Sequence, residues 1–272
     1  MGTQTGILKF TGRLGNVIGY RVGGKYHLRT MPEQVRQSPR SKASSRQFGK
    51  ASKLGAAMRH ALTGLTDIPH ESTLVNRLNK ALLGVLREDD LHRTKRFIPR
   101  HTQGLTGFCL TPHAGLSRLL TVTPDISRDN DGIITVSIPA METFNSNPQA
   151  THLSIKAVVV NIHHGCTAAD AITSEPVLLE AGRPSDAFTL QVPAQPDAIS
   201  CVLLEVISLR MENGRMYQLQ NRKYTAAEVI AVLPPQQEPR AITYSWDAMQ
   251  VQYHNHPIPC LPGMIIHSPQ RE

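Results

Sequence analysis

The sequence predicts an α+β protein in which an N-terminal β ribbon and basic arm lead into a helical hairpin and then a mostly antiparallel β-sandwich domain. Three observations predict it. The opening is glycine-rich with short β-prone runs, two later segments repeat apolar residues at helical spacing, and β-prone runs beyond residue 100 are separated by turn residues about every ten positions. We expect ribbon and arm over residues 1–45, a helical hairpin and linker over 46–100, the sandwich over 101–233 and a proline-rich tail over 234–272.

The positive charge is concentrated at one end of the chain. The 272 residues have a net charge of +8. Residues 1–100 contain 19 Lys and Arg against 6 Asp and Glu, a balance of +13, whereas residues 101–272 contain 10 against 15, a balance of −5. The positive end favours phosphates, anionic lipids or acidic protein surfaces, and the acidic remainder makes a second copy of the same chain a further partner.

The composition is typical of a folded, soluble protein. Hydrophobic residues make up 40% of the chain, which is ample for a buried core. No run approaches the roughly 18 apolar residues of a membrane span, and the opening residues lack the charged-then-apolar pattern of a secretory signal. We therefore expect the protein in the cytoplasm, or in an assembly built there. The four cysteines are widely spaced without a CxxC pair, which predicts neither a zinc framework nor a disulfide scaffold.

The first 45 residues predict a ribbon followed by an extended arm. Ile7–Gly12, Asn16–Val22 and Lys25–Arg29 are β-prone runs joined by two tight, glycine-containing turns. Such a ribbon is marginally stable by itself and leaves open edges, so we expect it to lie against another surface, in its own chain or in another. Thr30–Ser45 has no apolar period, contains two prolines and predicts an extended basic arm.

Two segments predict helices. Apolar or small residues recur at helical spacing over residues 46–65, with Ser44 or Ser45 as the N-cap. A second apolar stripe predicts a helix over residues 72–87, with its first residue, a serine, as the cap. The short connection between them makes a helical hairpin, and the polar, basic stretch over 88–100 is expected to be a linker.

Short β-prone runs separated by turn residues predict the sandwich. The runs are Phe108–Leu110, Leu119–Val122, Gly132–Ile138, His152–Ile162, Val177–Glu180, Ala187–Val192, Ala198–Met211 and Met216–Tyr224. The stretch Asp129–Gly132 predicts a turn. Asn213-Gly214 between the last two runs is the strongest short hairpin signal in the chain.

Several motifs of the chain occur together in a known pattern. They are Gly6-Ile7-Leu8 and Gly12–Tyr20 in the ribbon, Arg29 at its end, Phe48–Gly55 in the first helix and Tyr217–Tyr224 after the Asn-Gly turn. Through them the chain resembles, from Gly6 to Leu233, uncharacterised proteins common in Bacteroidota genomes that have an N-terminal glycine-rich β ribbon, a basic helix and a C-terminal β domain. The resemblance implies a fold and no activity, because the motifs consist of structural glycines and packing residues.

The basic arm and first helix are the strongest functional feature of the sequence. The residues expected to bind a partner or nucleic acid are Arg29, Arg36, Arg40, Lys42, Arg46, Lys50 and Lys53. They suit a nucleic-acid backbone, where they would exchange counterions for phosphates, or the acidic sandwich of an adjacent subunit. Because aromatic residues are only 5% of the chain, we expect no recognition of bases by stacking.

Sites for a metal or for catalysis have little support. The candidate metal ligands are His163, His164, Cys166, His254, His256 and Cys260. A structural zinc site usually combines two pairs of ligands, and the two ligands of each pair lie about two to four residues apart. Neither cluster has this spacing in both of its halves, so we expect no metal and no other cofactor. The chain contains no Gly-x-Ser-x-Gly nucleophile elbow, its glycine pairs precede strands and not helices, and no catalytic residue is assigned.

The expected function is therefore non-enzymatic. We expect a structural or assembly protein that forms a homo-oligomer through its N-terminal ribbon and basic arm, for example as a component of a virion or phage-derived particle. The alternative is a sequence-independent nucleic-acid-binding protein that uses the arm and first helix. A sandwich that recognises a carbohydrate or protein surface is a third reading, but it requires an exposed aromatic patch, and Trp246 in the tail is the only tryptophan.

Overall fold

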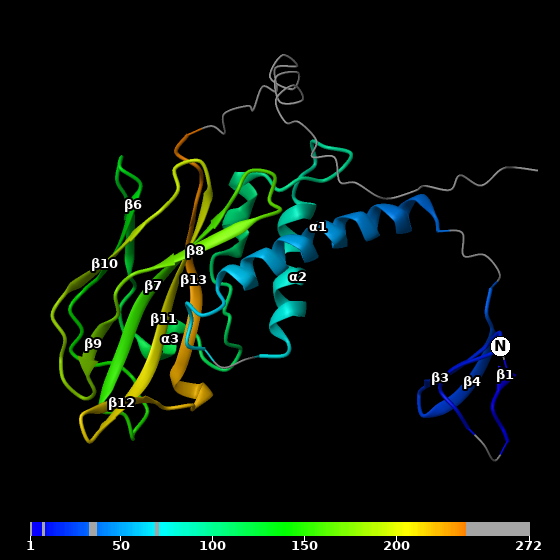
Figure 1. The fold of residues 1–272 in the computed structure, drawn as a ribbon, viewed down its shortest axis with the longest axis horizontal. Helices are drawn as coiled ribbons and strands as arrows, with labels where there is room; N and C mark the ends of the chain where they lie inside the picture. The colour runs from blue at the N-terminus through cyan, green and yellow to red at the C-terminus, as the bar shows by residue number, and fades with distance from the viewer. Residues whose placement is uncertain (1, 7–8, 33–36, 69–70, 238–272) are drawn as a thin grey trace, which may run out of the picture. The chain divides into compact units, whose positions relative to one another are not determined.

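A computed structural model describes residues 2–6, 9–32, 37–68 and 71–237 of the chain (Figure 1). Within these residues the helices and three antiparallel sheets come from largely separate parts of the sequence, which confirms the predicted α+β class. The chain divides into two units after Gln236. The tail expected over 234–272 lies outside the described residues from 238 onward.

The ribbon is a four-stranded antiparallel sheet in the order β1-β4-β3-β2. Its strands are β1 (Gly2–Thr3), β2 (Gly12–Leu14), β3 (Val17–Val22) and β4 (Lys25–Thr30). The turn between β3 and β4, at residues 23–24, is where the sequence predicted it. The turn between β2 and β3 lies at residues 15–16, whereas the sequence predicted it at 13–15, because Arg13 and Leu14 pair with β3 as part of β2. The expected strand over 7–12 is not formed as such: residues 7 and 8 lie outside the described residues, and the strand that pairs with β3 begins at Gly12.

Helix α1 (Pro39–Ala61) begins earlier than the sequence predicted. Its N-cap is Ser38, whose Oγ accepts a hydrogen bond from the backbone N–H of Ser41 at 3.1 Å. The expected extended arm to Ser45 is therefore wrong from Pro39 onward, and Ser44 and Ser45 are not caps. Pro39 favours this start, because the first helical position needs no N–H donor and the ring presets a helical φ.

Helix α2 (Leu74–Arg87) packs against α1 at a glycine. A Cβ atom on Gly55 would stand 2.6 Å from Oδ1 of Asn79 and 3.3 Å from Cδ1 of Leu82, so only glycine permits this approach. The expected cap at Ser72 is wrong. Thr73 holds the cap position without a capping hydrogen bond, and its own N–H and hydroxyl donate to the Glu71 carboxylate.

Two expected strands between the helices and the sandwich are not strands. Leu119–Val122 begins at the end of a one-turn helix, α3 (Leu116–Leu119), and Phe108–Leu110 contributes a single bridge, between Cys109 and Glu228. The expected linker ends in a 3₁₀ helix, η1 (Pro99–Leu105). These segments fill the space beside the sheets with short local turns, which explains their β-prone but brief apolar runs.

The large sheet has two long central strands, β7 (His152–Ile162) and β11 (Ile199–Glu212), which pair along the full length of β7. On its outer side β7 pairs with β8 (Ala169–Thr173) and β9 (Val177–Glu180). The outer side of β11 pairs with β13 (Thr225–Leu233) and β12 (Arg215–Gln218). Asn213 and Gly214 have φ of 50° and 74° between β11 and β12, which confirms the predicted hairpin as a type I′ turn.

The small sheet has the order β10-β6-β5. Its strands are β5 (Asp125–Arg128), β6 (Ile133–Ile138) and β10 (Phe188–Pro193). The predicted turn between β5 and β6 is confirmed: Oδ1 of Asp129 accepts hydrogen bonds from the N–H groups of Asp131 and Ile133.

The large sheet buries both of its faces, which produces two apolar clusters. Along β7, Val158, Val160 and Ile162 belong to the cluster shared with α1 and α2, whereas Ile155 and Val159 belong to the cluster shared with the small sheet. Figure 1 shows the two helices on one face of the large sheet and β6 and β10 on the other. The β part is thus sandwich-like, with a helical layer added. No helix among the described residues is both long and apolar enough to cross a membrane.

Candidate interaction surface

The two halves of α1 have different surroundings. In the first half, Pro39–Lys50, every side chain is exposed except that of Gln47, which is half-buried. In the second half, Ala51, Leu54 and Met58 are almost completely buried against α2 and the large sheet. The helix is about 34 Å long, so roughly its first three turns extend beyond the core.

One side of α1 is basic. Lys42, Arg46, Lys50 and Lys53 form this side and are called the basic stripe below. At 3.6 residues per turn the stripe lies opposite the buried side that contains Ala51 and Leu54. All four stripe residues are exposed. The sequence therefore places a row of positive charge on the surface of a helix whose other side anchors it to the core.

The line of the buried side of α1 continues into the first half of the helix, where its side chains are exposed among the described residues. By helical periodicity Ser44 and Phe48 extend the line of Ala51 and Leu54 toward the N-terminus. The side chain of Phe48 is 53% exposed. An exposed phenylalanine beside small residues, in line with a packed face, is a surface on which a second apolar element can pack.

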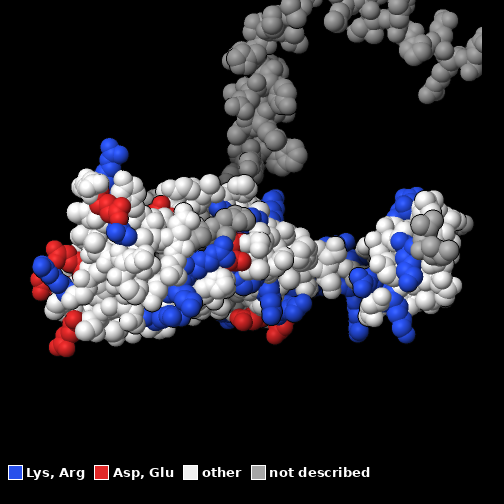
Figure 2. All heavy atoms as spheres, turned by 90° about the horizontal axis from the view of Figure 1, so that it is seen from below, with Lys and Arg blue, Asp and Glu red and all other residues white. Residues whose placement is uncertain are grey.

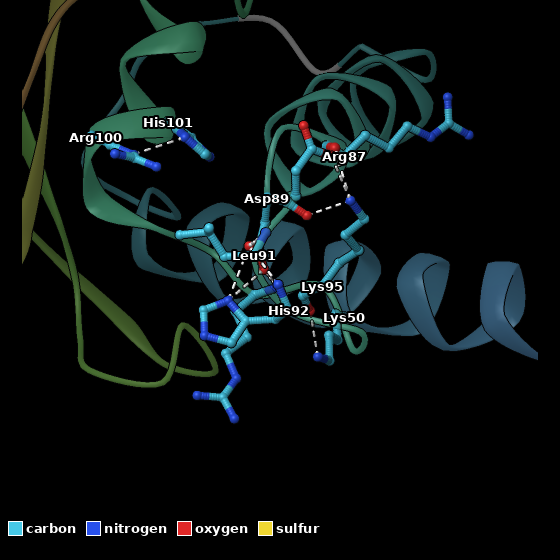
Figure 3. A network of polar contacts seen from close by, with 10 residues as sticks. Lys50, Arg87, Asp89, Leu91, His92, Lys95, Arg100 and His101 are labelled. Atoms are coloured by element: carbon cyan, nitrogen blue, oxygen red, sulfur yellow. Dashed lines mark hydrogen bonds and ion pairs between the residues drawn. The ribbon is translucent and has the colours of Figure 1, made fainter.

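A buried aspartate organises the loop after α2 (Figure 3). The Asp89 carboxylate is completely buried and accepts backbone hydrogen bonds from Leu91, His92 and Arg96, the last at 2.7 Å. Nδ1 of His92 lies 3.0 Å from Oδ1 of Asp89. Burial by itself would raise the pKa of Asp89, but the hydrogen bonds from the His92 side chain and from the N–H groups of Arg96 and His92 outweigh it and hold that pKa well below its ordinary value.

Lys95 joins this loop to the end of α2 and to α1. Its Nζ donates to the backbone oxygens of Asp89 and Arg87, near the C-terminus of α2, and lies 3.0 Å from Oδ1 of Asp90. A cation at this position satisfies carbonyl oxygens that a helix end leaves without partners. The Nζ of Lys50, on the basic stripe, donates to the Lys95 backbone oxygen at 2.6 Å. The stripe and the loop therefore meet (Figure 3).

This contact brings the loop segment that contains two further arginines next to the stripe. Arg93 and Arg96 are exposed and lie within two residues of Lys95 in the loop. The basic stripe together with Arg93 and Arg96 is called the basic band below. The ribbon is also positive, because residues 2–32 contain five Lys and Arg and no Asp or Glu. Figure 2 shows only basic charged side chains on the visible face of the ribbon, whereas both signs occur over the sandwich.

Four of the seven residues predicted to bind a partner lie on one side of α1, where they form the stripe. Arg40 is exposed near the start of α1, on the line of the packed side. Arg29 is exposed on β4, with its guanidinium 5.8 Å from the centre of the Tyr20 ring, and Arg36 lies outside the described residues. The sequence reasoning missed Arg93 and Arg96 by treating 88–100 as a linker, although the density of basic residues there was a signal.

A buried ion pair fixes the helical hairpin to the sheet. Glu205 on β11 is 1% exposed, and its Oε1 lies 3.2 Å from Nζ of Lys156 on β7. Its carboxylate also accepts the N–H of Asp67, from the connection between the helices, at 3.1 and 3.2 Å. Burial raises the pKa of Glu205, against the opposing charge of Lys156. These groups satisfy one another, so their role is to hold the helices in place.

The candidate metal ligands do not assemble into a site within the described residues. Nε2 of His163 is 2.9 Å from Oδ2 of Asp170, and burial raises the pKa of the Cys166 thiol to about 11, which disfavours the thiolate that a metal needs. No group of three His, Cys, Asp or Glu with metal-binding geometry occurs among the described residues. His254, His256 and Cys260 lie outside them.

Comparison with protein-family models, with curated proteins and with solved structures finds no match to this chain. The resemblance to the Bacteroidota proteins therefore stays a prediction. Among the described residues, the candidate interaction surface therefore consists of the exposed ribbon, the exposed apolar side of the first half of α1, and the basic band.

Proposed function

We propose that this protein is a non-enzymatic structural protein that forms homo-oligomers through its N-terminal ribbon and the exposed first half of α1. The observation that carries the proposal is the composition of the two buried clusters: neither contains any of the described residues of the ribbon or of α1 before Ala51. Some 45 residues are thus folded into a sheet and a helix without adding to the apolar core of their own chain.

The ribbon has features of a surface that needs a partner. Leu14 and Val22 are 66% and 59% exposed, although they are apolar residues within strands. The outer strands β1 and β2 contain two and three residues and leave backbone donors and acceptors at open sheet edges. A small ribbon of this kind gains stability when another element covers it. When two copies of the chain associate symmetrically, each copy supplies such a covering element to the other.

The exposed half of α1 supports the same reading. The side with Ser44 and Phe48 has small and apolar residues at the spacing that packs against α2 further along the helix. An extension of that packing by a neighbouring chain would cover Phe48 without placing the basic stripes of two copies against each other, because the stripe lies on the opposite side. Self-association through this side keeps the basic stripes of the two copies apart, and Arg40 is the one basic residue on the line of the packed side in this half of α1.

The proposal is tested with two triple variants of the full chain. The first variant carries Leu14→Ser, Val22→Ser and Phe48→Ser. It lacks the exposed apolar residues of the ribbon and of the first half of α1. The control variant carries Leu178→Ser, Met211→Ser and Met216→Ser, because these side chains are also large, apolar and exposed, by 37–49%, but lie on the sandwich. Light scattering on a sizing column measures the mass of each.

The expected result is a smaller mass for the first variant and an unchanged oligomer for the control. An oligomer that survives the first variant but dissociates in the control would place the interface on the sandwich and refute the proposal. A full-length protein that is monomeric at every concentration would refute self-association altogether.

A further inference from the structure

The basic band has the layout of a linear anion-binding surface. From Lys42 to Lys53 the stripe covers about 16 Å of a helix, with positive groups three or four residues apart. None of the six side chains of the band makes an ion pair with a carboxylate of a described residue. Their charges are therefore available to an external partner.

The loop around Asp89 turns one of its carboxylates away from the surface that holds the band. The Asp89 carboxylate is turned inward and uses both oxygens on hydrogen bonds within the loop, while Asp90 is paired with Lys95. The same hydrogen bonds hold the backbone that contains Arg93 and Arg96 next to Lys50. Asp89 is thus a positioning residue: it fixes where the two arginines of the loop stand relative to the helix.

We infer that the basic band binds the sugar–phosphate backbone of nucleic acid without reading base sequence. A row of cations on one side of a rigid helix matches a polymer with regularly repeated negative charge. The six residues of the band are all Lys or Arg, so none of them is an aromatic side chain that could stack on bases. Phe48, the nearest exposed aromatic residue in α1, is on another side of the helix.

An acidic face of a second copy suits the band less well. Several carboxylates on the sandwich already have basic partners in the same chain: Glu180 lies 2.5 Å from Arg183, and Glu212 lies 2.7 Å from Arg210. Such mixed charge offers a weak field to a row of six cations. The inference concerns a different side of α1 from the proposed self-association and does not depend on it.

Fluorescence polarisation with a labelled duplex of 20 base pairs and arbitrary sequence tests the inference on the full-length chain. The band variant carries Lys42→Gln, Arg46→Gln, Lys50→Gln and Lys53→Gln. The matched control carries Arg118→Gln, Arg183→Gln, Arg215→Gln and Lys223→Gln, which remove the same charge from exposed positions on the other part of the chain. A second duplex of unrelated sequence checks for base reading.

The full-length protein and the control are expected to lose roughly a hundredfold in affinity between 50 and 200 mM salt, the loss for about four phosphate contacts. In the band variant the slope of log K against log salt should flatten by about 0.9 for each contact removed. The inference is overturned if the band variant binds DNA like the control, or if the two duplexes differ by more than about tenfold. It is equally overturned if the band variant changes only the mass of the oligomer, since the band would then face another protein.

Discussion

The sandwich and the N-terminal segment use their residues in opposite ways. In β7 and β11 successive side chains are buried on both faces of the large sheet, and 13 of their 25 residues contribute to one of the two apolar clusters. In the ribbon and the first half of α1 most side chains are exposed, and charge replaces apolar content. The difference teaches that the sandwich and the second half of α1 supply the apolar core, whereas the N-terminal segment adds little to it and exposes most of its side chains among the described residues.

The largest expected effect separates the two regions by their contribution to folding. Leu204→Ala removes a fully buried side chain from β11 and should lower the free energy of unfolding by about 2–5 kcal/mol, since a cavity is left behind. Leu14→Ala in the ribbon should change it by less than about 0.5 kcal/mol. Urea unfolding of both variants measures this contrast. Equal losses would show that the ribbon belongs to the folding core, which would break the comparison.

The second prediction compares the effect on stability of a glycine-to-alanine substitution in each half of α1. Gly55→Ala places a methyl group against Asn79 and Leu82 and should cost about 1–3 kcal/mol by overpacking. Gly49→Ala meets nothing within 4 Å in the exposed half and should gain up to about 1 kcal/mol, because alanine favours the helix. Thermal unfolding, monitored by circular dichroism, measures whether each substitution raises or lowers the Tm. Destabilisation by Gly49→Ala would indicate that this half is packed against something.

The smallest effect is a dependence on pH at the junction of the two regions. Because the folded-state pKa of Asp89 is lowered from 3.8, its charge stabilises the fold above that value, and this contribution is lost as the pH falls toward the folded-state pKa. The fall in Tm caused by Asp89→Asn should therefore be larger at about pH 7 than at about pH 3. Asp90→Asn is the control, since that carboxylate is 91% exposed. A pH-independent loss in the Asp89 variant would contradict a role for the charge.

Much of the sandwich could be predicted from the sequence because a buried strand consists largely of apolar, β-prone residues, which indicate both the strand and its burial. The bounds of β7 and β9 agree with the sequence prediction, and Asn213-Gly214 forms the expected turn, since few other residues adopt positive φ at both positions. By contrast, β8 was not anticipated, and β13 was missed because the last predicted run stopped at Tyr224. The alternation of apolar and polar residues indicates which face of a strand is buried, but it does not indicate where one strand ends and the next begins.

The N-terminal segment was harder to predict for a physical reason. Apolar periodicity reports burial, and the first half of α1 buries nothing, so residues 39–45 showed no helical pattern although Ser38 and Pro39 form a good helix start. The basic stripe could still be identified from the spacing of its charges. The position of Arg93 and Arg96 near the stripe could not be predicted from the sequence. It depends on the contact between Lys50 and Lys95, which are 45 residues apart, and on the hydrogen bonds that the inward-facing Asp89 carboxylate accepts from the loop.

The most direct test of the proposed self-association is the absolute mass of the full-length chain beside that of a variant lacking residues 2–37, measured by light scattering at several concentrations. The deletion removes the ribbon and retains Ser38, so α1 keeps its N-cap. We predict a defined multiple of the 30.0 kDa chain for the full-length protein and a monomer for the variant. The same oligomeric state for both would contradict the claim that the N-terminal segment joins the copies.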